Sequence, residues 1–328
     1  MKLLGGIIFA ASAGVVYKLD SRSGEELESY ELTRELYAIY TPLTIYKSML
    51  ITVSQHHVVA IDRRKFKRIW KSNDLGDRFE CLEVISNRLC VASDGEVSVL
   101  DLDTGQTVFS ERFEGPRGAI TLLKDDTTDP TRPVCYVGFC GKIYVIDING
   151  HARLPMFITV SEDDTFGVSM CLFRGLLIAS SEGLLCAYDT TTMEECWLCQ
   201  FGPDTGYAFM NSIHPVCRDG KNIIVVGANG YVLGVDAKTG KALWITSLPR
   251  SGYNFVSTLH NNGTLYAATT GKLYGLDLFS GNILWSVGLP GMGTHSISII
   301  SPNDRNSMNS DTPILQSQGR LPSFSLFR

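Results

Sequence analysis

The sequence predicts an all-β protein, a seven-bladed β-propeller of four-stranded antiparallel blades. Three observations carry this prediction: one segment recurs seven times, each copy consists of short β-rich runs, and the copies share a turn that begins with aspartate. Repeats of this size build repeat architectures, and several short strands per repeat fit a propeller blade. The periodicity therefore sets the fold class.

The copies align on an aspartate that ends the second β-rich run of each copy. The aspartates are Asp20, Asp62, Asp101, Asp147, Asp189, Asp236 and Asp277, separated by 42, 39, 46, 42, 47 and 41 residues. The runs before them are alternating or continuously apolar, as in IIVVGANGYVLGVD at 223–236, and short Gly-containing breaks indicate hairpins. Helical repeats would instead show a period of about 3.6 residues. Each copy is therefore read as a set of strands.

The turn after the aspartate has its own pattern. Copies one, three, six and seven read DSRSGEELE, DLDTGQTVF, DAKTGKALW and DLFSGNILW. The aspartate can accept hydrogen bonds from N–H groups of the turn, and the glycine four residues later supplies the positive φ of a bulged hairpin. The sequence therefore predicts one kind of turn in most blades.

The tryptophans occupy one place in the repeat. All four (Trp70, Trp197, Trp244 and Trp285) stand eight residues after their aspartate, and Phe109 takes the same place in copy three. A propeller blade buries its faces only against its neighbours, so a large ring at a fixed place can cover the next sheet. We expect these rings to dock one blade on another.

The pattern V-Y-x-L-D-x-x-[TS]-G-x-x-x-W resembles the repeat of the quinoprotein-type propellers, whose repeats bind pyrroloquinoline quinone. The resemblance covers about residues 5–300. Copy four departs from it, with Gly150 displaced and no tryptophan, and copies two and five lack the turn glycine. The resemblance implies the fold without choosing an activity, because such propellers include alcohol dehydrogenases, an outer-membrane assembly scaffold and the tails of acyl-activating enzymes.

Residues 1–301 are predicted to form a single propeller, and residues 302–328, rich in Ser, Asn, Asp and Pro, a flexible C-terminal tail. Copy one begins at Met1 without room for an innermost strand, whereas GTHSISIIS at 293–301 has no copy of its own. We expect this C-terminal strand to complete blade one and close the ring.

The first fourteen residues, MKLLGGIIFAASAG, imitate a secretory signal. They also belong to a repeat, because GGIIFAASAGVVYKLDSRSG at 5–24 parallels GTLYAATTGKLYGLDLFSG at 263–281. Nine cysteines, an odd number, fit thiols in a reducing compartment. A cytoplasmic location is therefore expected, with a secreted protein as the alternative.

Charge and hydropathy exclude two classes of partner. The net charge is −5, and the densest basic stretch, Arg63-Arg64-Lys65 with Lys67 and Arg68, sits inside a repeat turn. It is interpreted as a solvated hairpin rather than a phosphate-binding patch, so no nucleic-acid partner is predicted. No apolar run reaches the roughly 18 residues of a membrane helix, so no membrane span is predicted.

Neither a metal nor another cofactor is predicted. The one CxxC, Cys196 to Cys199, lies in a predicted strand, where positions i and i+3 point to opposite faces. His56 and His57 are adjacent, so their side chains diverge, and no third ligand is near in sequence. The quinone-dependent alcohol dehydrogenases are exported and carry adjacent cysteines, and no Cys-Cys pair occurs here, which makes that activity the least expected one.

Loops leading into the innermost strands gather on one face of a propeller, which we call the entrance face. They carry aromatic residues with Arg117 and His295 nearby, and the predicted ligand-binding set is Tyr37, Phe79, Arg117, Phe166, Tyr207, Tyr253 and His295. Aromatic and arginine side chains anchor interfaces, and concave ring mouths form pockets. For each ring the alternative is that it packs the mouth of its blade.

The leading functional hypothesis is a non-catalytic scaffold that binds a protein partner or a small organic ligand at this face. The alternative is an enzyme, such as a lyase, hydrolase or cyclase of a small organic substrate, with its active site in the central funnel. His214, His260 or His295 would then act as general base beside Asp77 or Asp164, although no spacing enforces such a pair. Catalytic residues are therefore not assigned.

Overall fold

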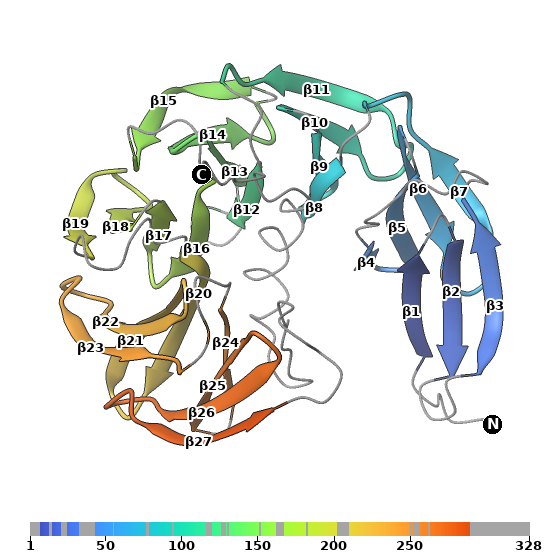
Figure 1. Cartoon of the computed structure of the whole chain (residues 1–328). Coiled ribbons are helices and arrows are strands. Elements are labelled where there is room, and N and C mark those ends of the chain that lie inside the picture. The colour runs from blue at the N-terminus through green and yellow to red at the C-terminus, as the bar shows by residue number, and fades with distance from the viewer. Residues whose placement is uncertain are drawn as a thin grey trace, which may run out of the picture. The chain divides into compact units, whose positions relative to one another are not determined.

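The computed structural model describes the chain in a series of stretches that contain its strands. They are residues 7–12, 15–20, 25–32, 43–54, 56–76, 79–93, 95–115, 120–125, 129, 131–150, 152–161, 167–181, 183–201, 210–249, 251, 256–261 and 263–288. All regular secondary structure in these stretches is β-strand, and the strands form seven sheets (Figure 1). No helix within them is long and apolar enough to cross a membrane.

We number the sheets as blades in chain order. Blade one holds β1 (Ile7–Ser12), β2 (Val15–Asp20) and β3 (Glu26–Glu31). Blade two holds β4 (Leu43–Tyr46), β5 (Met49–Ser54), β6 (His57–Asp62) and β7 (Arg68–Lys71). Blade three holds β8 (Phe79–Ile85), β9 (Arg88–Ser93), β10 (Glu96–Asp101) and β11 (Thr107–Arg112). Blade four holds β12 (Thr121–Asp125), β13 (Val134–Phe139), β14 (Lys142–Asp147) and β15 (Ala152–Thr159).

The last three blades have the same order of neighbouring strands. Blade five holds β16 (Ser169–Phe173), β17 (Leu176–Ser181), β18 (Leu184–Asp189) and β19 (Glu195–Gln200). Blade six holds β20 (Met210–Arg218), β21 (Lys221–Ala228), β22 (Tyr231–Asp236) and β23 (Ala242–Ser247). Blade seven holds β24 (Ser257–Asn261), β25 (Thr264–Thr269), β26 (Lys272–Asp277) and β27 (Ile283–Gly288). Each sheet is therefore a meander, as the repeat predicts.

The chain divides into two compact units, residues 1–135 with 145–154, and residues 136–144 with 155–328. The first contains blades one to three, the second contains blades five to seven, and the division falls within blade four. That residues 1–301 form one single propeller domain therefore stays a prediction. The closing strand predicted at 293–301 and the tail at 302–328 lie outside the described residues.

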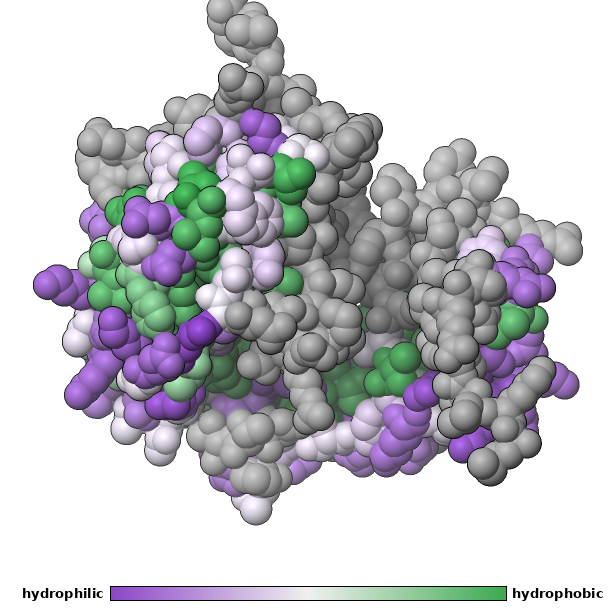
Figure 2. Space-filling model, turned by 90° about the horizontal axis from the view of Figure 1, so that it is seen from below, coloured by the Kyte–Doolittle hydropathy of each residue, from purple (hydrophilic) through white to green (hydrophobic). Residues whose placement is uncertain are grey.

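Burial explains the two kinds of run in the sequence. The middle strands are buried on both faces, as in β6, β9 and β18, and their sequences are almost continuously apolar. The outermost strands are largely exposed, and β19 and β23 bury only their tryptophan fully. They expose Leu198, Leu243 and Ile245, and Figure 2 shows apolar residues interspersed with hydrophilic ones on the surface it presents.

The aspartate turn has the predicted hydrogen bonds. Asp236 Oδ1 accepts the backbone N–H of Lys238 at 3.2 Å and that of Thr239 at 2.9 Å, and the Thr239 hydroxyl donates to the same oxygen at 2.7 Å. The N–H of Gly240 donates to the Asp236 carbonyl at 2.9 Å. Gly240 has a φ of +70°, and the register of β22 with β23 shifts here, as in a bulged hairpin. Asp101 and Asp277 build the same turn.

Copies two and five form this turn without glycine. Phe66 and Met193 stand four residues after their aspartates with φ of +51° and +59°. Left-handed backbone disfavours a residue with Cβ by about 1–2 kcal/mol, so another interaction must offset the cost. For Phe66 the offset is burial, because the ring is 6% exposed and packs with Val16, Leu50 and Ile61 between blades one and two.

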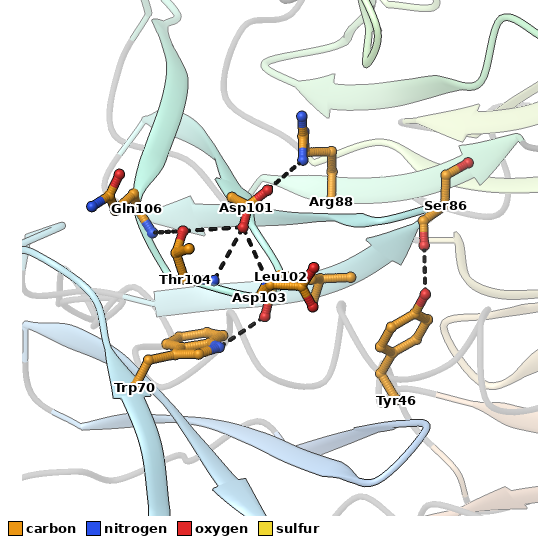
Figure 3. Close-up of polar contacts among 9 residues, drawn as sticks. All are labelled: Tyr46, Trp70, Ser86, Arg88, Asp101, Leu102, Asp103, Thr104 and Gln106. Atoms are coloured by element: carbon orange, nitrogen blue, oxygen red, sulfur yellow. Dashed lines mark hydrogen bonds and ion pairs between the residues drawn. The ribbon is translucent and has the colours of Figure 1, made fainter.

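Three tryptophans dock one blade on the next within their own unit. The Nε1 of Trp70 donates to the Leu102 carbonyl at 2.8 Å (Figure 3), and Leu102 directly follows Asp101. Trp197 and Trp244 make the same bond to Ala237 and Leu278, each at 3.0 Å. The rings are at most 9% exposed. The docking role predicted for these three tryptophans is therefore confirmed.

The turn glycine of the next blade makes room for each docked ring. A Cβ at Gly105 would lie 2.4 Å from Cε3 of Trp70. At Gly240 and Gly281 it would lie 2.6 Å from Trp197 and 2.5 Å from Trp244. Such distances are too short for van der Waals contact. The glycine is thus needed both for its positive φ and for the ring above it.

Trp285 differs from the other three. It lies on β27 with 41% of its surface exposed. Its docking stays a prediction, since the turn of copy one lies outside the described residues.

Candidate functional site

Of the seven residues predicted for the entrance face, the structure describes one. Tyr37, Arg117, Phe166, Tyr207, Tyr253 and His295 lie outside the described residues. The predicted site as a whole therefore stays a prediction. The structure does describe the strands that begin beside several of these residues.

Phe79 is the one described member of the set. It opens β8, pairs in register with Ser93 at the end of β9, and is partly buried. Its ring packs against the core between blades two and three, which contains Ile51 and Trp70. Phe79 therefore takes the packing role that the sequence left open for each ring, and its contact with a ligand stays a prediction.

Buried hydroxyl groups gather where the innermost strands begin. They are Ser93, Thr121, Ser169, Ser180, Ser181, Ser212, Ser257, Thr258 and Thr269. In the described part of the chain Ser93 Oγ and Ser180 Oγ have no hydrogen-bond partner. An unpartnered buried hydroxyl costs free energy unless water or a bound group satisfies it. The starts of the described innermost strands thus carry or adjoin buried hydroxyl groups.

A hydrogen-bonded contact fixes the innermost strands of blades six and seven side by side. Ser212 Oγ on β20 lies 2.9 Å from the Val256 carbonyl oxygen and 2.9 Å from Thr258 Oγ1 on β24. The strands approach closely at this point, because a Cβ on Gly227 would lie 2.3 Å from the same carbonyl oxygen. These residues were not predicted from the sequence, in which small side chains at the strand starts are the available signal.

This contact bears on two predicted site residues. Tyr207 precedes Ser212 by five positions, and Tyr253 precedes Val256 by three. The chain therefore leaves both tyrosines within a few residues of one fixed point.

Two of the histidines considered as general bases lie in innermost strands. His214 is in β20 and 4% exposed, and His260 is in β24 and partly buried. Their suggested partners, Asp77 and Asp164, lie outside the described residues, as does His295. The acid–base pair of the enzyme alternative therefore stays a prediction.

Six of the nine cysteines are buried in the packed interior. All nine are free, and burial raises the pKa of Cys171 and of Cys186 to about 12. A thiol with so high a pKa is a poor nucleophile at neutral pH. Cys196 and Cys199 flank the buried Trp197 on β19, which confirms that they are strand residues. Within the described stretches no three His, Cys, Asp or Glu side chains are placed to hold a metal ion.

The adjacent histidines also have separate surroundings. The ring of His57 bonds the Ser72 carbonyl at 3.1 Å through Nδ1, whereas His56 Nδ1 lies 4.0 Å from Asp74 Oδ1. The rings are 6.4 Å apart and nearly perpendicular. They therefore diverge, as predicted.

The comparison with protein families decides the relationship. The family model of the outer membrane protein assembly factor BamB matches residues 3–161 and 167–321. The chain belongs to the BamB family. No curated protein sequence matches the chain significantly.

Solved structures with similar folds support the same fold class. BamB from Moraxella catarrhalis is 16% identical with a TM-score of 0.64, over 90% of this chain and 88% of that chain. Saccharomyces cerevisiae Sqt1 is 15% identical with a TM-score of 0.68, over 85% of this chain and 81% of that chain. The seven-bladed β-propeller prediction is confirmed as a fold class, with the quinoprotein-type repeat.

The fold also accommodates an enzyme. The dihydro-heme d1 dehydrogenase NirN, in complex with DHE, is 14% identical with a TM-score of 0.65, over 88% of this chain and 64% of that chain. At such identities the similarity shows the fold alone. Membership of the BamB family and the side chains of the site must therefore carry any functional argument.

Proposed function

We propose that this chain is a non-catalytic binding module that holds a protein partner, or a small organic ligand, on its entrance face. The match to the BamB assembly-factor family carries the proposal, because it spans nearly the whole chain. An assembly factor works by holding other proteins, and a propeller offers one rigid face for that purpose. A protein partner would place an exposed segment against the aromatic residues predicted at this face.

The turn aspartates and the buried thiols have structural roles. Asp62 and Asp189 each accept two backbone N–H bonds from their own turn, and these bonds lower the pKa of both carboxyl groups. A carboxylate used in this way stabilises its turn and stays ionised at neutral pH. Burial raises the pKa of the Cys171 and Cys186 thiols, because it disfavours the charged thiolate. These groups serve the fold.

Site-specific photocrosslinking tests the proposal. A benzophenone amino acid replaces Tyr207 or Tyr253 in the full chain, and extracts of the source cells supply partners. The matched controls carry it at Leu198 or Leu243, which are 53% and 47% exposed on outermost strands. We expect one discrete adduct from the entrance positions and none from the controls. Equal labelling at all four positions would contradict the proposal.

A second measurement separates binding from packing at the same residues. Tyr207→Ala and Tyr253→Ala are expected to weaken the adduct partner's binding while leaving the melting temperature nearly unchanged. A large loss of stability would assign the rings to packing, as for Phe79. If the wild type turns over a small organic substrate and His214→Gln does not, the result would instead favour the enzyme.

A further inference from the structure

Blade two carries charge of almost one sign. Residues 43–71 contain seven lysines and arginines and a single acidic residue, Asp62. The whole chain has 29 basic and 34 acidic residues, so this distribution departs from that of the rest of the protein. The sequence alone does not distinguish a solvated hairpin from a binding surface at this place.

The structure brings five of these seven cations to one end of the blade. Successive hairpins of a meander lie at opposite ends of a sheet, so the β4–β5 hairpin and the β6–β7 turn share the end away from the entrance face. The backbone N–H of Arg63 donates to the Ser48 carbonyl at 2.9 Å, and Arg63 Nη1 donates to the Lys47 carbonyl at 2.9 Å. The basic hairpins are thereby joined. We call Lys47, Arg63, Arg64, Lys65 and Lys67 the basic turn surface.

The backbone of the β6–β7 turn is fixed by local contacts. Asp62 Oδ1 accepts the N–H of Arg64 at 2.8 Å and that of Lys65 at 2.7 Å, which fixes the turn. Phe66, in the middle of the turn, buries its ring between blades one and two. The cationic side chains therefore project from a backbone that is already ordered, and binding orders little more of the chain.

Four cations of this surface form no side-chain ion pair within the described residues. Lys47, Arg64, Lys65 and Lys67 are exposed, and the charged group of none of them lies within 4.0 Å of a described carboxylate. The corresponding aspartates of blades three and four instead hold arginines, in the pairs Arg88–Asp101 at 2.7 Å and Arg132–Asp147 at 2.9 Å. Asp62 is the acidic group nearest to the turn in sequence, and its Oδ1 is occupied by the turn.

Blade two also departs from the repeat at the positions that carry the charge. In blades three, six and seven the third residue after the aspartate is Thr104, Thr239 or Ser280, whose hydroxyl bonds the aspartate. Blade two has Lys65 there and Phe66 where those blades have glycine. The turn of blade two thus lacks both the hydroxyl that bonds the aspartate and the glycine, at the place where its basic residues are concentrated.

We propose that the basic turn surface is a docking site for an acidic segment of a protein partner, distinct from the entrance face. Arginine and lysine side chains bind carboxylates by charge-assisted hydrogen bonds. The surface lacks an aromatic platform for nucleobases, because Phe66 is buried and the Tyr46 ring is covered by Lys47 Nζ at 4.8 Å. The turn likewise presents no exposed apolar side chain at its tip for insertion into a membrane.

Fluorescence anisotropy of a labelled peptide of about twelve residues, built of Glu and Ser, tests this proposal with the full chain. The test variant is Arg64→Glu/Lys67→Glu. The matched control is Lys238→Glu/Lys241→Glu, which changes the same positions of the blade-six turn and the same net charge. We expect the test variant to bind about tenfold or more weakly than the wild type, and the control within about twofold, with affinity falling as salt rises.

Other outcomes overturn the proposal. Equal losses in both variants would mean that only net charge matters, and absence of wild-type binding at low salt would remove the site. Tighter binding of an oligothymidylate, or of vesicles containing phosphatidylserine, with the same loss in the test variant would assign the surface to nucleic acid or membrane. Self-association that is lost in the test variant would make a second copy of the chain the occupant. Circular dichroism shows whether both variants remain folded.

Discussion

Trp244 Nε1 donates a hydrogen bond of 3.0 Å to the carbonyl oxygen of Leu278, the residue that follows the turn aspartate of the next blade. The ring lies against Gly281 of that turn, where a Cβ would come within 2.5 Å of it. The Trp244 side chain thus depends on two features of the neighbouring blade, the backbone carbonyl that accepts its hydrogen bond and the glycine that leaves room for its ring. The same relationship joins Trp70 to Gly105 and Trp197 to Gly240.

Removing a docked ring should destabilise the protein strongly. Trp197→Ala or Trp244→Ala deletes a side chain that is at most 9% exposed and leaves a cavity between two blades. The expected cost is about 3–5 kcal/mol, measured by equilibrium urea unfolding. Leu198→Ala, next to Trp197 but 53% exposed, is the control and should cost less than about 0.5 kcal/mol. Similar losses for Leu198 and Trp197 would contradict the docking.

Adding one methyl group to the turn glycine should test the same tryptophan contact from the side of the neighbouring blade. Gly281→Ala places a Cβ against the Trp244 ring at a φ of +73°, and we expect a loss of about 2–4 kcal/mol from strain and displacement. Gly175→Ala has nearly the same backbone, φ +78°, with nothing within 4 Å of the added atom. It should cost only the backbone part, about 1 kcal/mol. Equal losses would show that the ring does not constrain the turn.

The two turns without glycine should respond oppositely to its introduction. Phe66→Gly relieves the left-handed backbone but removes a ring that is 6% exposed, so we expect a net loss of about 2 kcal/mol or more. Met193→Gly relieves the same strain at a partly exposed side chain. Its effect should lie between no change and about 1 kcal/mol of stabilisation. Thermal melts of both variants decide this, and a stabilised Phe66→Gly would refute the anchoring role of the ring.

The turn aspartates should make stability depend on pH in acid. The N–H of Thr192 and the hydroxyl of Ser280 are the main causes that lower the pKa of Asp189 and of Asp277 below the ordinary 3.8. A group whose pKa is lower in the folded state stabilises it above the unfolded pKa and loses this effect as the pH falls through the folded value. We therefore expect urea midpoints to be level above about pH 5 and to fall below pH 4.

Asn substitution identifies the source of that pH dependence. Asp189→Asn keeps an acceptor oxygen but cannot titrate, so stability should be lower at pH 7 and should fall less steeply in acid. Asp219→Asn lies in a hairpin rather than at an aspartate turn and is the control. An acid response that Asp189→Asn leaves unchanged would exclude Asp189 as a contributor.

Several parts of the fold could be predicted from the sequence because they depend on local chemistry. An aspartate, the N–H groups two and three residues later, and a residue with positive φ lie within one turn, so their relation is written in the order of the chain. The seven copies then multiply a weak local signal into a fold class. Phe66 and Met193 were not predicted to adopt positive φ, because the local rule assigns that conformation to glycine; for Phe66, burial of the ring offsets the cost.

Only part of the candidate site could likewise be predicted from the sequence. The repeat indicates which loops share a face, but the partner of a side chain in another blade has no fixed distance along the chain. The pair of Ser212 with Thr258, 46 residues apart, became visible only when β20 and β24 lay side by side. Phe79 shows the converse, because its sequence position alone did not distinguish a ring in the core from a ring at a mouth.

The sequence by itself determined the repeat, its strands, its aspartate turns and the places of its tryptophans. Tertiary structure alone decided what each ring packs on, which hydroxyls meet, and which cations of blade two are joined at one end of a sheet. The physical reason is the range of the interactions: turn hydrogen bonds close within five residues, whereas docking and charge clustering arise between segments that only folding brings together.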